Sequence, residues 1–162
     1  MSNSLTEKIY VLDTNILFDL SVWLPMDLNK VFWTQFEEAL QNGKWILLDV
    51  VADEIRGDND GLKKWCEEQK KKGFVKNLED SHRTRSVEIN EQYPMIDEST
   101  QRSTVDTYLI AYTEANEHTI FTREGYRKKS NDLHKIPDVC RALNIKFIRR
   151  PRDFFEMLGY KN

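Results

Sequence analysis

Residues 9–15 read Ile9-Tyr10-Val11-Leu12-Asp13-Thr14-Asn15, a short run of β-forming residues that stops at an acid. A continuous apolar run of this length is typical of a strand covered on both faces. Directly after it, Ile16, Leu17 and Leu20 recur at helical spacing, and Asp13 can cap that helix. The stretch therefore predicts a strand that leads straight into a helix, with an acid at the junction.

The same alternation of strand and helix continues along the chain. Strands that alternate with helices favour a parallel sheet with helices on both faces, because parallel neighbours need crossover connections. The fold class we expect is α/β, a three-layer α/β/α sandwich with a mainly parallel central sheet. Further strands are expected at 45–48, 119–122 and 145–148, and helices at 28–40, 50–55, 105–115, 137–143 and 153–158.

The length of the chain favours one domain that spans residues 1–162. At 162 residues it falls within the usual single-domain range of roughly 100 to 200 residues. Residues from about 58 to 102 contain no convincing strand and are dense in Lys, Glu and Arg. We expect this stretch to form a helical insertion, two or three polar helices that lie as a flap beside the sheet.

Composition indicates a soluble globular protein. Hydrophobic residues make up 40% and charged residues 31% of the chain, which excludes both a disordered acidic chain and a membrane protein. No apolar run approaches the ~18 residues of a membrane span, and the first residues are polar. We therefore expect a cytoplasmic protein with no membrane partner. Cys66 and Cys140 lie too far apart in the sequence to suggest a zinc site or a disulfide framework.

The net charge of -3 is unlike that of a strongly basic nucleic-acid coating protein, but the Lys and Arg residues are clustered. Taken alone, such clusters are most simply solvated faces. Beside a site that cuts a polyanion, they could hold phosphates by charge attraction. The first cluster contains Lys63, Lys64, Lys70, Lys71, Lys72, Lys76, Arg83 and Arg85, and the second Arg123, Arg127, Lys128, Lys129, Lys135, Arg149, Arg150 and Arg152.

Four acids stand at or near the carboxyl ends of the predicted strands, where parallel α/β sheets form their ligand sites. Asp13 directly follows the first strand, and Glu124 lies two residues beyond the third. Glu54 lies one turn into the helix after the second strand, on or beside its inward apolar stripe. Asp106 is in the first turn of a helix whose apolar residues face the core, where the helix dipole favours negative charge.

Each acid also has an ordinary explanation. Asp13 can be an N-cap, Asp106 can close a capping box with Ser103, and Glu54 and Glu124 can be solvated. Together, four carboxylates at one sheet end repel one another unless a divalent cation neutralises them. Mg²⁺ or Mn²⁺ is the cation we expect, because both prefer carboxylate and water ligands.

Four motifs carry a resemblance to a known family. They are Val11-Leu12-Asp13-Thr14-Asn15, Val50-Val51-Ala52-Asp53-Glu54, Asp106-Thr107-Tyr108-Leu109-Ile110-Ala111 and Phe121-Thr122-Arg123-Glu124. In order and spacing they resemble the four acidic motifs of PIN domains, from about Ile9 to Leu158. The stretch Lys135-Ile136-Pro137-Asp138-Val139-Cys140 is similar to a poorly characterised bacterial branch of PIN-like proteins.

The resemblance implies an Mg²⁺- or Mn²⁺-dependent ribonuclease, such as the VapC-like toxins of bacterial toxin-antitoxin pairs. Asp13, Glu54, Asp106 and Glu124 would then be the catalytic metal ligands for one or two ions. Asn15 and Thr122 would orient the carboxylates, since neutral amide and hydroxyl groups can bridge neighbouring acids. The partners expected are RNA and, for a toxin, a cognate antitoxin, and a homodimer is left open.

Two questions stay open at this point. The fourth motif has Glu124 where PIN domains more often have Asp, so either Glu124 or Asp138 could complete the site. An enzyme is also not the only reading, because a PIN-like scaffold with an incomplete metal site could bind RNA or a protein without cutting. A haloacid-dehalogenase-like phosphatase would need a second Asp where this chain has Asn15, and a phosphate-binding NTPase would need a Gly-rich loop.

Overall fold

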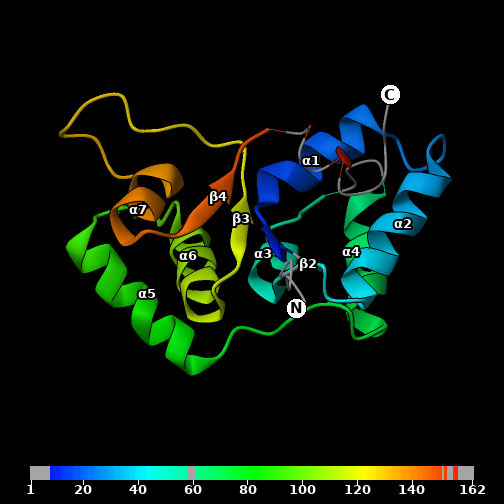
Figure 1. Cartoon of the computed structure of the whole chain (residues 1–162), viewed down its shortest axis with the longest axis horizontal. Coiled ribbons are helices and arrows are strands. Elements are labelled where there is room, and N and C mark those ends of the chain that lie inside the picture. The colour runs from blue at the N-terminus through cyan, green and yellow to red at the C-terminus, as the bar shows by residue number, and fades with distance from the viewer. Residues whose placement is uncertain (1–7, 58–60, 151, 153–154, 157–162) are drawn as a thin grey trace, which may run out of the picture.

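A computed structural model describes residues 8–57, 61–150, 152, 155 and 156. Four strands form one sheet in the order β2-β1-β3-β4, and every neighbouring pair is parallel (Figure 1). The α/β fold class and the parallel sheet predicted from the sequence are confirmed. The strands are β1 (Tyr10–Leu12), β2 (Trp45–Ile46), β3 (Thr119–Phe121) and β4 (Lys146–Ile148).

Helices cover both faces of the sheet, which gives the three layers of an α/β/α sandwich. In Figure 1, α5, α6 and α7 lie on one side of the strands, and α1, α2 and α4 lie on the other. Of the helices described, none has the combination of length and apolar character needed to cross a membrane. The helices are α1 (Thr14–Trp23), α2 (Lys30–Gln41), α3 (Asp49–Asp53), α4 (Leu62–Lys71), α5 (Asp80–Gln92), α6 (Thr104–Asn116) and α7 (Ile136–Leu143).

The two central strands form the middle of the core, since all residues of β1 and β3 are buried. Their register pairs Val11 with Ile120 and Leu12 with Phe121. This register brings the last residue of β1 level with the last residue of β3. The residues that follow the two strands, beginning with Asp13 and Thr122, therefore emerge at the same edge of the sheet.

The elements differ from their predicted bounds mainly after β2. The second strand ends at Ile46 rather than at 48, and Leu48 instead forms an isolated parallel bridge with Lys76. The helix that follows has only five residues. Residues 62–92, within the predicted insertion, form α4 and α5, whereas residues 58–60 lie outside the described residues. Most of the helix expected at 153–158 also lies outside them.

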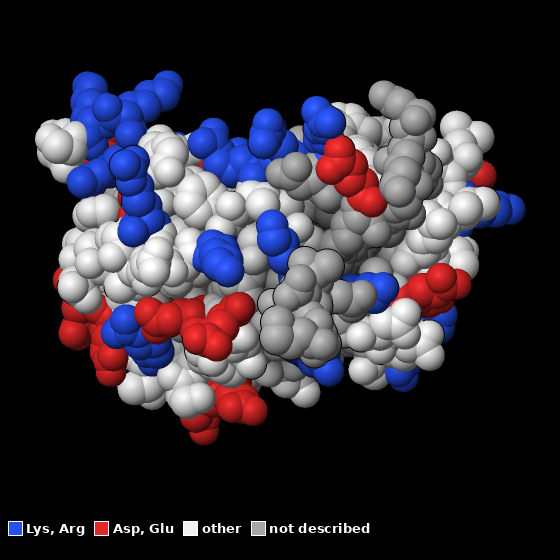
Figure 2. Space-filling model, in the orientation of Figure 1, with Lys and Arg blue, Asp and Glu red and all other residues white. Residues whose placement is uncertain are grey.

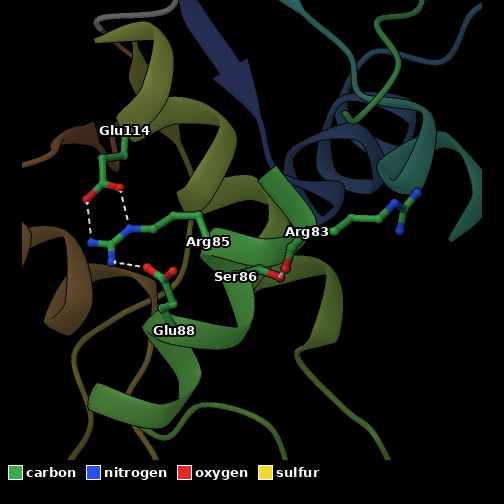
Figure 3. Close-up of polar contacts among 5 residues, drawn as sticks. All are labelled: Arg83, Arg85, Ser86, Glu88 and Glu114. Atoms are coloured by element: carbon green, nitrogen blue, oxygen red, sulfur yellow. Dashed lines mark hydrogen bonds and ion pairs between the residues drawn. The ribbon is translucent and has the colours of Figure 1, made fainter. Parts of the chain in front are cut away.

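Helix α5 is held to α6 by one arginine (Figure 3). Arg85 donates from Nε to Glu114 Oε1 at 2.7 Å and from a second nitrogen to Glu114 Oε2 at 3.1 Å, and it also contacts Glu88 at 3.1 Å. Arg83 points the opposite way in Figure 3, and its guanidinium lies 5.1 Å from the centre of the Tyr108 ring. Both arginines therefore join the insertion to α6, the helix that carries Asp106.

Candidate metal centre

Asp13 stands at the junction between β1 and α1 and caps the helix. Its Oδ1 accepts a hydrogen bond from the Thr14 backbone N–H at 2.7 Å, and its Oδ2 accepts one from the Thr122 hydroxyl at 2.6 Å. Asp13 is 5% exposed and Thr122 is fully buried. The Thr122 hydroxyl also accepts from the Glu124 backbone N–H at 3.0 Å. Thr122 thus joins Asp13 to the segment that carries Glu124, which is the kind of contact that an orienting role requires.

Three acids meet at this point. Asp13, Asp106 and Glu124 each place a carboxylate oxygen within 4.8 Å of the other two, and we call them the acidic cluster. Asp106 comes from the first turn of α6, and Glu124 comes from the loop after β3. The cluster therefore draws on three segments that are far apart in the sequence, and parallel pairing of β1 with β3 brings two of them together.

Burial and mutual repulsion give the acidic cluster an unusual affinity for protons. The pKa of Asp13 rises to about 6, chiefly because the carboxylate is desolvated, although its hydrogen bond from Thr122 opposes the rise. The pKa of Glu124 rises to about 7, first through burial and then through the charge of Asp13. Burial and the charges of Asp13 and Glu124 also hold the pKa of Asp106 well above its usual value. A divalent cation would offset both the desolvation and the repulsion of the carboxylates, because it binds their oxygens in place of water and neutralises their charge.

Glu54 lies beside the cluster but is not one of its three converging acids. Helix α3 ends at Asp53, so Glu54 follows it as the C-cap, and it is exposed where the sequence placed it on or beside the inward apolar stripe. The Thr14 hydroxyl donates to Glu54 Oε1 at 2.7 Å. The charge of Glu54 contributes to the raised pKa of Asp13 and of Asp106.

An open groove of about 340 Å³ leads away from Glu54. It is lined by residues of α3, of the turn after α3 and of the start of α6. Glu54 therefore lines this groove and also acts through its charge on Asp13 and Asp106 of the acidic cluster. The lining residues are Val50, Asp53, Glu54, Arg56 and Val105.

The structure separates the two candidates for the fourth acidic position. Glu124 belongs to the acidic cluster. Asp138 Oδ2 instead accepts the backbone N–H groups of Arg127 and of Lys135, the N-cap residue of α7, both at 2.9 Å. Asp138 acts on the cluster only through its charge, which adds to the raised pKa of Glu124.

Two neighbours of Asp13 in the chain also hold the site together. The Asn15 side chain accepts the backbone N–H of Arg123 at 3.3 Å, and its hydrogen bond to Asp13 lowers the pKa of that acid. No role was expected for Thr14, yet its hydroxyl binds Glu54. The only signal for Thr14 in the sequence is its place beside Asp13 in the first acidic motif.

The oxygen ligands present match the preference of hard divalent cations. Carboxylate oxygens are favoured by Mg²⁺ and Mn²⁺, and Mg²⁺ keeps several of its waters when only a few protein ligands are offered. Asp13, Asp106 and Glu124 would hold such an ion, with Glu54 placed to join directly or through water. The described residues show this one group of acids that could hold a metal.

The lysines of the insertion are only partly available to a ligand. Lys70 contacts Asp53, and Lys72 contacts Glu37 on α2. Lys63, Lys64 and Lys71 of α4 are exposed. The predicted use of this helix to follow an RNA backbone therefore rests on the last three lysines alone.

Replacing Thr122 by Val should destabilise the fold. Val keeps the shape of the side chain but leaves a buried oxygen of Asp13 without its donor, and we expect a loss of about 1 to 3 kcal/mol in the free energy of unfolding. Urea titration without divalent ions measures this loss. Thr122→Ser keeps the hydroxyl and is the matched control. An equal loss in Thr122→Ser would assign the effect to packing and not to the hydrogen bond.

A family model described as "Domain of unknown function (DUF4411)" matches residues 10–161. The match includes all the residues of the acidic cluster, Glu54 and the basic residues of the second cluster. No curated protein and no solved structure matches the chain.

Proposed function

We propose that this chain, which belongs to the DUF4411 family, is a metal-dependent ribonuclease that hydrolyses RNA phosphodiester bonds. The observation that carries the proposal is the convergence of three carboxylates within 4.8 Å at the carboxyl end of a parallel sheet. The resemblance of the four acidic motifs to those of PIN domains supports the same activity. We further propose that the protein works in the cytoplasm.

The residues of the chain divide into ligands and supporting groups. Asp13, Asp106 and Glu124 supply oxygen ligands, and Glu54 stands at the mouth of the adjoining groove. Thr122 and Asn15 hold Asp13 in place. A bound Mg²⁺ or Mn²⁺ would polarise the phosphodiester and lower the pKa of a water for in-line attack. With the 3′-oxygen as the leaving group, which takes up a proton, this attack leaves products with 5′-phosphate and 3′-hydroxyl ends.

RNA is the substrate class that the surroundings favour. Figure 2 shows Lys and Arg side chains along the upper edge of this face, the edge at which β3 and β4 end in Figure 1, and the residues of the second basic cluster follow these two strands in the chain. Such a surface attracts a polyanion, whose phosphates would otherwise be repelled by the acids. A metal-dependent nuclease needs such cations near its acids, because they hold the phosphates of the strand that is cut.

Incubation of the purified chain with an end-labelled RNA pool tests the proposal. With Mg²⁺ or Mn²⁺ we expect fragments that carry 5′-phosphates, and with a chelator we expect none. The metal dependence must persist after a second purification, which removes a contaminating nuclease. Binding of the pool without cleavage in either metal would instead favour the scaffold, a PIN-like protein that binds RNA or a protein partner.

A toxin role is a narrower proposal that the family match does not address. It predicts that expression of the chain arrests growth and that a protein encoded beside it binds and inhibits it. The cognate antitoxin and the homodimer therefore stay predictions. Growth curves of cells that express the chain alone, or together with the neighbouring gene, would test whether a cognate antitoxin exists.

A further inference from the structure

Two exposed aromatic side chains flank an arginine beside the acidic cluster. Trp23, the last residue of α1, is 53% exposed, and Tyr126 is 41% exposed. Arg149 is near both of them. It lines the same hollow as Trp23, and its guanidinium lies 5.7 Å from the centre of the Tyr126 ring. We call these residues the Trp23–Arg149–Tyr126 row.

The row lies at the edge of the sheet that carries the acidic cluster. Arg149 directly follows β4, and Tyr126 lies two residues after Glu124. Helix α1 starts from Asp13, so Trp23 is about 15 Å along the helix axis from the acid. An RNA strand that crosses the acidic cluster can therefore reach the row within a few nucleotides of the bond that is cut.

The hollow between Trp23 and Arg149 is small. Its volume is about 60 Å³, much less than the roughly 300 to 1,000 Å³ of pockets that enclose a ligand. Arg123 also lines it and pairs with Asp19 at 2.6 Å, so one arginine is fixed while Arg149 faces both the hollow and Tyr126. A flat group would lie across this surface and not enter it. The full lining is Ile16, Asp19, Leu20, Trp23, Phe121, Arg123 and Arg149.

Aromatic rings that alternate with arginine match the chemistry of an unpaired nucleotide strand. Bases stack on aromatic rings and on guanidinium planes, and phosphates pair with the arginine charge. A protein partner would not require this excess of cations, which includes the exposed Arg150, Lys128 and Lys129 nearby in the chain. We propose that the Trp23–Arg149–Tyr126 row stacks the bases of single-stranded RNA next to the acidic cluster. The inference names a substrate-binding surface for the proposed ribonuclease and rests on that function.

Binding is measured without divalent ions, so that no cleavage is needed for the test. A fluorescein-labelled single-stranded RNA decamer is titrated with the chain in a chelator and followed by anisotropy. We expect Trp23→Ala to weaken binding at least about fivefold, as the loss of one stacked base does. Val22→Ala is the matched control, because Val22 is 65% exposed on the same helix and does not line the hollow. It should leave the affinity unchanged.

A decamer of the same length with abasic sites separates stacking from charge. On this probe Trp23→Ala should bind as well as the unmodified chain, since the phosphates are still present. Arg149→Gln should lower the slope of affinity against salt by about 0.7 on either probe, the value for one phosphate contact on a single strand. Equal affinities of Trp23→Ala and the unmodified chain for the normal decamer, or equal losses on both probes, would overturn the proposal.

Tryptophan emission gives a second readout that does not depend on a weakened variant. Trp33, Trp45 and Trp65 are buried, so a base that stacks on the row should quench mainly Trp23. Trp23→Phe keeps a ring for stacking, and we expect it to bind the decamer while losing most of the quenching. Full quenching in Trp23→Phe would place the strand elsewhere. Neither readout requires cleavage, so a chain that binds in this way but never cuts would refute only the ribonuclease.

Discussion

Asp13→Asn should abolish RNA cleavage while leaving a folded protein that still binds RNA. The substitution removes the charge of the one acid that contacts both Thr14 and Thr122. Stabilisation of transition-state charge by a metal is worth several kcal/mol, and each 1.36 kcal/mol is tenfold in rate. Loss of this ligand should therefore lower the cleavage rate by about a thousandfold. Product formation from labelled RNA in Mg²⁺ measures it.

The fold should tolerate Asp13→Asn, because Asn can form hydrogen bonds with the same two partners. An Asn side chain can accept from the Thr14 N–H through its oxygen and donate to the Thr122 hydroxyl through its amide, and Asn caps helices about as well as Asp. Burial already opposes the charged form of Asp13, whose pKa rises to about 6. The melting temperature in a chelator should therefore not fall, and RNA affinity should be kept or improved because a repelling charge is gone.

Glu88→Gln is the matched control for Asp13→Asn. It removes one negative charge from α5, where Glu88 is exposed and forms an ion pair with the partly exposed Arg85 (Figure 3). An exposed pair of this kind contributes little to stability. Glu88→Gln should cleave as the unmodified chain does. Full cleavage by purified Asp13→Asn would refute the proposed mechanism and favour the scaffold.

The sequence predicted the positions of the acids that closely follow a strand. Asp13 and Glu124 follow β1 and β3, and parallel pairing of these strands is enough to bring both acids to one edge. Asp106 could be expected there because it begins a helix whose apolar face is in the core. In each case the position depends on an element with a clear apolar pattern that packs in the core, which is the primary signal of secondary structure in a sequence.

The details that the sequence could not give depend on where short elements end. Glu54 is exposed at the C-cap of the five-residue helix α3, and spacing alone does not indicate where so short a helix ends. The choice between Glu124 and Asp138 depends on the start of α7, where a carboxylate oxygen of Asp138 accepts the backbone N–H of Lys135. The Trp23–Arg149–Tyr126 row requires the end of α1 to lie beside the end of β4, which follows only from tertiary packing.

Mg²⁺ or Mn²⁺ should raise the melting temperature, and the increase should grow with pH. A ligand that binds only the folded state adds about 2.7 kcal/mol at 100 times its dissociation constant. For a domain of this size, that energy corresponds to an increase of about 5 to 10 °C. Scanning calorimetry at saturating metal measures it. Asp106→Asn should lose the increase, whereas Glu88→Gln should keep it.

The pH dependence follows from the direction of the pKa shifts. The folded-state pKa values of Asp13 and Glu124, about 6 and about 7, lie above their ordinary values, and that of Asp106 is raised as well. Without metal, these carboxyls bind protons more tightly in the folded state, so their contribution to stability is present at acid pH and is lost as pH rises through about 4 to 7. Metal must displace the same protons, because only the ionised carboxylates are ligands. The increase in melting temperature should thus be small at pH 5 and close to its full size at pH 8, and an increase of equal size at both would show that the metal binds somewhere other than this cluster.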